Sequence, residues 1–206
     1  MKKNILFFSF IFVFGAAASS LSGKEIARIR VAIAKDTQEV VVSVDGSYDI
    51  FDIRKNKVIQ NGRNMHASRV VAVKEGLKIK NTVFETDALV IVPKKKAAVM
   101  VRNRRYRGDI SVGKDLSGKL LVVNTLDLES YVKGVLYHEI SPKWPMDAIK
   151  AQAVAVRTYA LYQKEVMKNK NYDVTADVSS QVYGGFFAET SKTNRAVHFT
   201  KDEVLL

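Results

Sequence analysis

The first half of the chain alternates short apolar runs with polar turns, a pattern typical of β-strands. Between Arg28 and Val123 these runs are 4 to 7 residues long, rich in valine and isoleucine, and separated by Gly, Asn, Asp or Lys. The runs read RIRVAIA, EVVVSV, YDIFDI, RVVAV, LKIK, ALVIV, YRGDISV and KLLVV. Because β-branched side chains pack well on a pleated surface, we expect an antiparallel, β-rich part over residues 28–123.

The hydrophobic period changes at Asp127 from about two to about 3.6 residues, which indicates a helix. One face of this helix is apolar and consists of Leu128, Tyr131, Val132, Val135 and Leu136. Asp127 is a suitable N-cap residue. Pro142 disfavours helix beyond Ser141. The pattern therefore predicts a first helix over about residues 128–138.

A second helix is predicted to begin at Pro145, because the missing N–H of a proline would be unpaired in the first turn anyway. Asp147 in this first turn complements the helix dipole. The apolar stripe of the helix consists of Ile149, Ala153, Val156 and Ala160. Its many alanines allow other backbone to approach closely, so we expect a buried helix.

These patterns predict an α+β fold: a β-rich antiparallel lobe, then a two-helix segment that carries the active-site loop, then further strands. We expect residues 24–206 to form one domain. The β-rich part occupies residues 28–123, and residues 124–206 form the helical part that carries the chemistry.

The chain opens with MKKNILFFSFIFVFGAAASS, in which two lysines precede an apolar run and a cluster of small residues. We interpret residues 1–18 as a secretory signal peptide cleaved near Ala18, with an uncleaved anchor as the alternative. No later segment approaches the roughly 20 apolar residues of a spanning helix, so we expect no transmembrane segment after cleavage. The predicted location is secreted, periplasmic or cell-wall associated. The absence of cysteine excludes disulfides and thiolate chemistry.

The net charge is +12, from 33 basic and 21 acidic residues, which favours an anionic partner through long-range attraction. An exported protein rarely meets nucleic acid, so we expect no nucleic acid partner and consider envelope polymers with carboxylates or phosphates instead. The alternative is that the lysines only keep the protein soluble. The segment RNRRYR, residues 102–107, leaves a similar choice, because it could follow a polyanion or protect an edge strand by its charges.

Glu139 is the leading candidate for chemistry, because it lies in the connection between the two predicted helices, where scaffolds often present functional groups. A carboxylic acid acts as a general acid only if it is protonated at the working pH, which requires burial or a negative environment. Lys150 and Arg157, seven residues apart on the second helix, either line a cleft near it or extend to solvent. The alternative is that Glu139 is an ordinary surface residue.

Further downstream, Gln181 and Tyr183 lie in the strand-like run YDVTADVSSQVYGG. Both could hydrogen-bond a sugar, or both could be ordinary sheet residues. Ser179 and Ser180 lack the context of a nucleophile elbow, which argues against a serine hydrolase. The three histidines, His66, His138 and His198, are scattered along the sequence and do not have the spacing of metal ligands.

Taken together, several stretches resemble the stage II sporulation protein D (SpoIID) family and its LytB-type relatives. The central motif is L-x-L-E-x-Y-x-x-G-V followed by E-x-x-x-x-W-P-x-x-A-x-K-A-Q-A-V-A-x-R-T-Y-A. The other matching stretches are RIRVAI, RYRGDISV, YDVTADVSSQVYGG and ETSKTNRAVHFTKDEVL. The resemblance covers about residues 28–206, so we interpret residues 24–206 as a SpoIID-like domain.

The resemblance implies lytic transglycosylase activity on peptidoglycan glycan strands, particularly strands without stem peptides. Glu139 matches the catalytic glutamate of the family. The substrate-binding residues of the family match Lys150, Gln152, Arg157, Gln181 and Tyr183. Glycosidases that use water normally need two carboxyl groups. A lytic transglycosylase can manage with one, because the 6-hydroxyl of muramic acid attacks its own anomeric carbon.

Two departures from the family pattern shape what we expect. Some members place zinc ligands before the Q-x-Y motif, but residues 175–180 read TADVSS here, so we expect neither a metal nor another cofactor. The family pattern also continues past the strand expected at residues 203–206, so the domain is expected to be incomplete at its carboxyl end. The competing function is a non-catalytic peptidoglycan-binding protein that stimulates a cell-wall amidase. A third option is a basic polyanion-binding protein.

Overall fold

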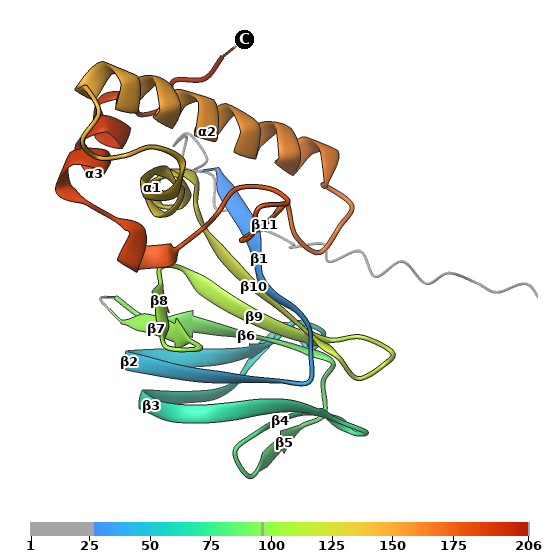
Figure 1. Cartoon of the computed structure of the whole chain (residues 1–206). Helices are drawn as coiled ribbons and strands as arrows, with labels where there is room; N and C mark the ends of the chain where they lie inside the picture. Colours follow the sequence, from blue (N-terminus) through green and yellow to red (C-terminus); the bar gives the residue numbers. More distant parts are fainter. Residues whose placement is uncertain (1–26, 96, 206) are drawn as a thin grey trace, which may run out of the picture.

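The computed structural model describes residues 27–95 and 97–205. The predicted signal peptide, residues 1–18, lies outside the described residues. The chain is an α+β protein in which helices gather at one end of a large sheet (Figure 1), which confirms the predicted fold class. The strands are β1 (Arg28–Thr37), β2 (Glu39–Asp52), β3 (Lys57–Val73), β4 (Gly76–Ile79), β5 (Thr82–Phe84), β6 (Ala88–Pro93), β7 (Ala98–Val101), β8 (Arg104–Tyr106), β9 (Asp109–Lys114), β10 (Leu120–Asp127) and β11 (Val174–Thr175).

The sheet follows the order β11-β1-β10-β9-β6-β2-β3-β4-β5, and β7 joins it between β2 and β8. Every pairing is antiparallel except the short parallel pair of β1 with β11. β8 pairs with β7 alone and so forms an edge. The segment RNRRYR supplies this edge strand, in agreement with the edge-strand alternative.

Two predicted strands, EVVVSV and YDIFDI, are joined in the structure into the single long strand β2. Gly46 makes this possible, because its φ of +104° is a conformation that other residues rarely adopt. The side chain of Asn64 on β3 accepts the Gly46 N–H at 2.8 Å. The register of the pair shifts between Val44 and Ser47, so a bulge carries the strand through the apparent turn.

The amino-terminal half of β3 was not predicted, although it pairs with β2 along nearly its whole length. Its outward positions are polar and exposed, and Met65 and Ser68 are its first buried residues. The strand therefore lacks the apolar alternation that sequence reasoning depends on.

The helices are α1 (Leu128–Glu139), α2 (Met146–Val166) and α3 (Ser191–Phe199), with a short 3₁₀ helix η1 (Gly185–Ala188). The predicted apolar faces of α1 and α2 are buried in a core that is continuous with that of the sheet. Pro145 is the N-cap of α2 and not its first helical residue. The chain after α2 differs from the prediction in detail, because it holds one two-residue strand, β11, together with η1 and α3. Apolar residues of α3 pack on the other helices, which explains why this polar segment is helical.

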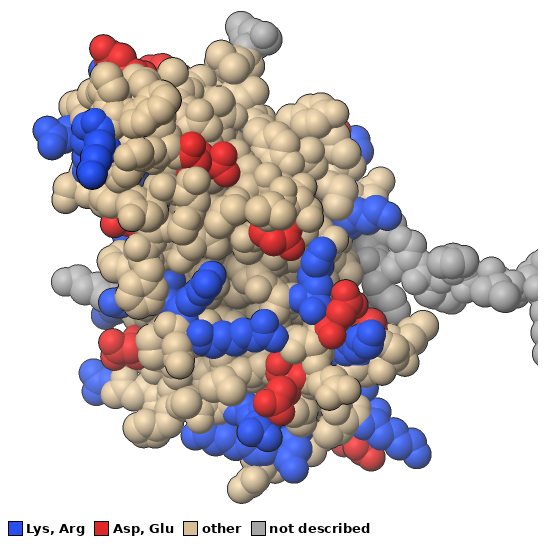
Figure 2. Space-filling model, in the orientation of Figure 1, with Lys and Arg blue, Asp and Glu red and all other residues tan. Residues whose placement is uncertain are grey.

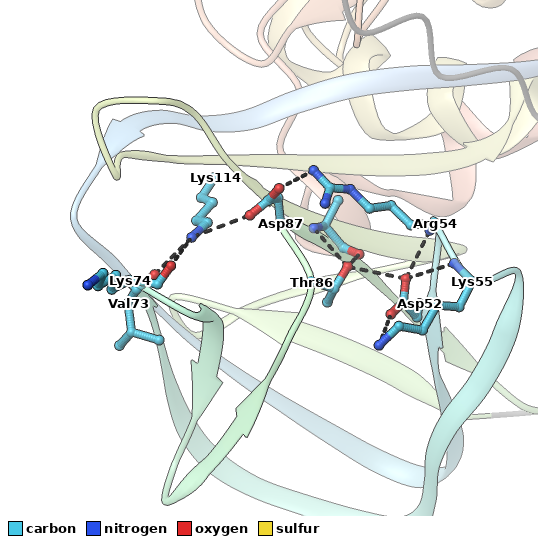
Figure 3. A network of polar contacts seen from close by, with 9 residues as sticks. Asp52, Arg54, Lys55, Val73, Lys74, Thr86, Asp87 and Lys114 are labelled. Carbon is cyan, nitrogen blue, oxygen red and sulfur yellow. Dashed lines mark hydrogen bonds and ion pairs between the residues drawn. The ribbon is translucent and has the colours of Figure 1, made fainter.

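A polar network fixes the loops at the end of the sheet away from the helices (Figure 3). The buried carboxylate of Asp52 accepts the N–H groups of Arg54 and Lys55 at 2.9 and 3.1 Å and the hydroxyl of Thr86 at 3.2 Å. Asp87 pairs with Arg54 and, at 3.3 Å, with the ammonium group of Lys114. Because the acceptors of Asp52 are used internally, we assign this network to the stability of the loops.

No helix in residues 27–95 and 97–205 combines the length and the apolar character that a membrane crossing requires. Most Lys and Arg side chains visible in Figure 2 lie over the middle and the lower half of that face, where the sheet is. The positive charge of the visible face is thus carried largely by the β-rich part.

Candidate functional site

Local capping rules place Glu139 at the end of α1. The carboxylate of Asp127 accepts the N–H of Ser130 at 2.8 Å and starts the helix. Ile140 has an extended conformation, with φ −149° and ψ 140°, and its N–H still reaches the Leu136 carbonyl. Glu139 is therefore the last helical residue, directly before the loop 140–145 that leads into α2.

The side chain of Glu139 is exposed, as are most of its neighbours in the sequence at the end of α1 and in the loop that follows. Tyr137 and Trp144 are 46% and 56% exposed. Within the described residues Glu139 has no hydrogen bond or ion pair. Its charge still reaches the Tyr131 phenol, whose pKa is raised chiefly by burial and further by Tyr159 and Glu139.

The loop after Glu139 is fastened to α3. The ammonium group of Lys192 donates to the carbonyl of Trp144 at 2.6 Å. Lys192 thus holds the backbone of the loop from the side of α3, while the indole ring of Trp144 remains largely exposed. Trp144 is the single tryptophan of the chain, so its fluorescence reports on this loop alone.

Lys150 lies near the start of α2 on the side that faces α3. Its ammonium group pairs with Asp147 at 3.1 Å and lies 5.4 Å from the centre of the Phe199 ring. The Asp147 side chain is 93% exposed, so this pair is weak and easily exchanged. Gln152, two residues further along α2, is half-buried. Neither residue hydrogen-bonds Glu139 among the described residues.

Arg157 occupies a different environment, although it shares a helical face with Lys150. Its side chain is 1% exposed and forms a two-fold ion pair with Glu129 of α1, with Nε–Oε1 and Nη2–Oε2 distances of 2.8 Å each. Its Nη1 donates to the Glu203 carbonyl at 2.9 Å and more weakly to Ala153 at 3.5 Å. The structure does not bring Arg157 to a surface beside Glu139, because every guanidinium nitrogen is engaged inside the protein.

Gln181 and Tyr183 are buried against α1, at 8% and 2% exposure. The hydroxyl of Tyr131 donates to Gln181 Oε1 at 3.0 Å, and the hydroxyl of Tyr183 donates to Asn124 Oδ1 at 2.9 Å. The two tyrosine rings stack with centroids 5.4 Å apart. Burial raises the pKa of both phenols, so they stay neutral and act as hydrogen-bond donors.

Two glycines permit this packing. A Cβ at Gly134 would lie 2.4 Å from Cε2 of Tyr183, and one at Gly184 would lie 2.4 Å from Nε2 of His138. The Gly184 N–H also donates to the Gly134 carbonyl at 3.0 Å. The Q-x-Y-G segment is therefore seated directly on the last two turns of α1, and it positions the end of the helix that carries Glu139.

Three residues of this assembly were not singled out from the sequence: Glu129, Asn124 and Gly134. Asn124 is 0% exposed and follows the four apolar residues that begin β10, and its amide also donates to the carbonyls of Arg107 and Asp109. A polar residue directly after an apolar run and a glycine inside a helix are the signals that could have indicated Asn124 and Gly134.

The segment 175–180 is closed by hydrogen bonds. The carboxylate of Asp177 accepts the Thr175 hydroxyl at 2.8 Å and the Ser179 N–H at 2.9 Å. These bonds, with that of Thr175 first, lower the pKa of Asp177. In the part of the chain that the structure describes, no group of three or more His, Cys, Asp or Glu side chains is placed to hold a metal ion.

Comparison with known proteins adds the family. The model of the family described as "Stage II sporulation protein" (SpoIID) matches residues 116–206. An uncharacterized protein of Brachyspira hyodysenteriae is 32% identical over 179 residues, which are 85% of this chain and 47% of that protein. A protein of Bacillus subtilis named "Amidase enhancer" is 40% identical over 75 residues, 36% of this chain and 10% of that protein.

The chain thus spans about half the length of the first relative and a tenth of the second. The residues matched by the family model include α1, α2, the Q-x-Y segment and α3. They also include β10, from which Asn124 reaches Tyr183. The predicted resemblance is confirmed for residues 116–206, over which the chain matches the model of the SpoIID family.

Proposed function

We propose that this chain is a peptidoglycan lytic transglycosylase that cleaves glycan strands lacking stem peptides and leaves 1,6-anhydro-muramic acid ends. A cell-wall function is supported by the SpoIID domain and by the similarity to the protein named "Amidase enhancer". The amino-terminal pattern of residues 1–18 would export the chain to the compartment that holds this polymer.

One contrast within α1 carries the proposal. The helix has two glutamates, and Glu129 is held by Arg157. Glu139 is exposed at the helix end and has no hydrogen-bonded partner within residues 27–95 and 97–205. An acid that protonates a glycosidic oxygen must be reachable by the substrate. Glu139 meets this requirement and Glu129 does not.

In the proposed reaction the protonated Glu139 carboxyl donates its proton to the glycosidic oxygen as the bond from that oxygen to C1 of muramic acid breaks. The resulting carboxylate then accepts the proton of the C6 hydroxyl, while the oxygen of that hydroxyl bonds to C1. Glu139 returns to its starting form, and no water is consumed. A strand lying over the exposed end of α1 would remove water from Glu139, which favours the neutral acid that the first step requires.

Substrate contacts are proposed for the surface around Glu139. Tyr137 and Trp144 offer exposed rings, and Gln152 offers an amide. Lys150 can exchange its weak pair with Asp147 for the lactyl carboxylate of muramic acid. Arg157, Gln181 and Tyr183, which the family resemblance implies as binding residues, are proposed to act through the position of α1.

The central test compares Glu139→Gln with Glu165→Gln, which changes an exposed glutamate at the far end of α2. Purified glycan strands without peptides are incubated with each protein, and anhydro-muramic ends are counted by mass spectrometry. We expect Glu139→Gln to abolish these ends while leaving the unfolding temperature unchanged, and Glu165→Gln to behave as the wild type. Full turnover by Glu139→Gln would refute the assignment.

A second candidate function is binding without cleavage, in which the chain stimulates a cell-wall amidase. It is favoured by the name of the Bacillus relative and by the internal engagement of Arg157. A purified amidase acting on intact peptidoglycan distinguishes the two. If the chain only binds, wild type and Glu139→Gln will stimulate peptide release equally, and neither will produce anhydro ends.

A further inference from the structure

The 3₁₀ helix η1 covers the edge strand β8 and presents two phenylalanines beside it. Gly185 adopts φ +65°, and a Cβ at this position would lie 2.7 Å from the Arg105 carbonyl. Only glycine allows the two backbones to approach so closely. The next residues, Phe186 and Phe187, are 37% and 70% exposed. Apolar side chains that are exposed side by side are candidates for a binding surface when polar groups surround them.

Two guanidinium groups flank the ring of Phe186. Arg107 lies 4.6 Å and Arg105 lies 5.2 Å from its centroid, both within the range of cation–π contact. Glu189 holds Arg107 by bonds of 2.8 and 3.0 Å. Within the described residues Arg105 has no carboxylate partner. Together with Phe187, the residues Phe186, Arg105 and Arg107 form what we call the aromatic–arginine surface. The positive charge of Arg105 on this surface is not neutralised by a carboxylate of the described residues.

The composition of this surface defines the ligand it fits. An exposed aromatic ring offers a flat apolar face to the C–H face of a pyranose, and a neighbouring guanidinium offers two parallel donors to a carboxylate. We propose that Phe186, Phe187, Arg105 and Arg107 bind acidic sugar residues of a glycan strand. A polyanion without sugar rings would use Arg105 but would gain nothing from Phe187.

The aromatic–arginine surface lies close to the end of α1. Gly184, which directly precedes η1, donates its N–H to Gly134 at 3.0 Å and packs against His138. His138 is the residue before Glu139. A strand that passes Glu139 can therefore continue onto η1. This inference rests on the proposed function, because it extends the same substrate beyond the bond that is cleaved.

The test measures binding in the Glu139→Gln background by isothermal titration calorimetry, so that cleavage does not interfere. Phe187→Ala and Arg105→Gln are compared with two controls, Tyr162→Ala for a similarly exposed ring on α2 and Arg63→Ala for an exposed arginine on β3. The ligands are purified glycan strands without peptides and inorganic polyphosphate.

We expect Phe187→Ala and Arg105→Gln each to weaken glycan binding about fivefold or more, the loss of one stacking or cation contact. The controls should stay within about twofold. Polyphosphate should respond to Arg105→Gln and not to Phe187→Ala. Unchanged glycan affinity in both variants overturns the proposal, even if the wild type cleaves strands. Loss of polyphosphate binding alone assigns the surface to phosphate polymers and also overturns it.

The converse outcome separates the two proposals. If the wild type produces no anhydro ends but Phe187→Ala still weakens glycan binding, the catalytic assignment of Glu139 fails and the aromatic–arginine surface stands.

Discussion

Arg157 of α2 is tied to Glu129 of α1 by two parallel bonds of 2.8 Å, with the arginine side chain 1% exposed and the glutamate 20% exposed. This pair fixes one helix against the other about ten residues before Glu139. Arg157 also holds the backbone of Glu203, and the Leu205 N–H reaches the Thr158 hydroxyl at 2.9 Å. The position of the candidate acid and that of the segment after α3 thus depend on the same arginine.

Replacing Arg157 by alanine is expected to lower the free energy of unfolding by about 3 kcal/mol, because it leaves a largely buried carboxylate without its partner. Lys150→Ala breaks only an exposed pair and should cost less than about 1 kcal/mol. Urea unfolding followed by circular dichroism measures both. If Arg157→Ala unfolds like the wild type but binds glycan strands more weakly, the ion pair opens in solution and Arg157 contacts the substrate.

The bond between Tyr131 and Gln181 gives a second prediction. Tyr131→Phe removes the donor at 3.0 Å and leaves the amide oxygen of Gln181 buried without it, which should cost about 1–3 kcal/mol. Tyr162→Phe, which alters a ring that is 63% exposed, serves as the control and should change stability by less than about 0.5 kcal/mol. Thermal unfolding of the three proteins measures the difference. Equal stability of all three would show that water replaces the lost hydroxyl.

Both ends of α1 and the start of α2 could be predicted to within one residue, because they depend on local rules. Asp127 caps α1 through its own side chain, and Pro142 and Pro145 lie in the loop 140–145 that separates α1 from α2. The resemblance to the SpoIID family was likewise available from the motif alone. Features that depend only on residues close together in the sequence can be predicted in this way.

The roles of Lys150 and Arg157 could not be separated from sequence. Their spacing of seven residues places them on one face of α2, but α3 meets that face at Lys150 and α1 meets it at Arg157. Which of the two charges becomes buried depends on how the three helices pack, which spacing does not encode. For the same reason Gln181 and Tyr183 could be named as a motif while their partners, Tyr131 and Asn124, could not.

For Gly134→Ala we predict a change in stability opposite in sign to the one that helix propensity alone would give. Glycine to alanine in a helix normally stabilises by about 1 kcal/mol. Here the new methyl group would lie 2.4 Å from the Tyr183 ring, so Gly134→Ala is expected to destabilise by about 1–3 kcal/mol. Chemical denaturation of Gly134→Ala, Tyr183→Leu and the double variant measures the coupling. Leucine at position 183 has no ring and should relieve the clash, so Gly134→Ala should cost less stability in the double variant than it does alone. Stability changes that simply add would contradict the contact between Gly134 and Tyr183.

Three of the buried tyrosines predict how stability depends on alkaline pH. Burial is the largest cause that raises the pKa of Tyr106, Tyr131 and Tyr183 in the folded protein. A phenol in the unfolded chain titrates near pH 10, so above this pH the unfolded state binds fewer protons than the folded state. The stabilisation is complete below about pH 10 and is lost as the pH rises toward the folded pKa, by about 1.4 kcal/mol per pH unit for each tyrosine.

Urea unfolding at a series of pH values from neutral to strongly alkaline tests this dependence, with the ultraviolet absorbance of tyrosinate followed in parallel. Tyr183→Phe removes one of the three phenols and should make the alkaline loss of stability less steep, whatever its effect at neutral pH. Tyr162→Phe changes an exposed ring and should leave the slope as it is in the wild type. The buried phenols should contribute tyrosinate absorbance only as the protein unfolds. Tyrosinate that forms while the fold is intact, with a slope that Tyr183→Phe does not alter, would mean that the stack of Tyr131 on Tyr183 admits water and cannot hold the end of α1 rigidly.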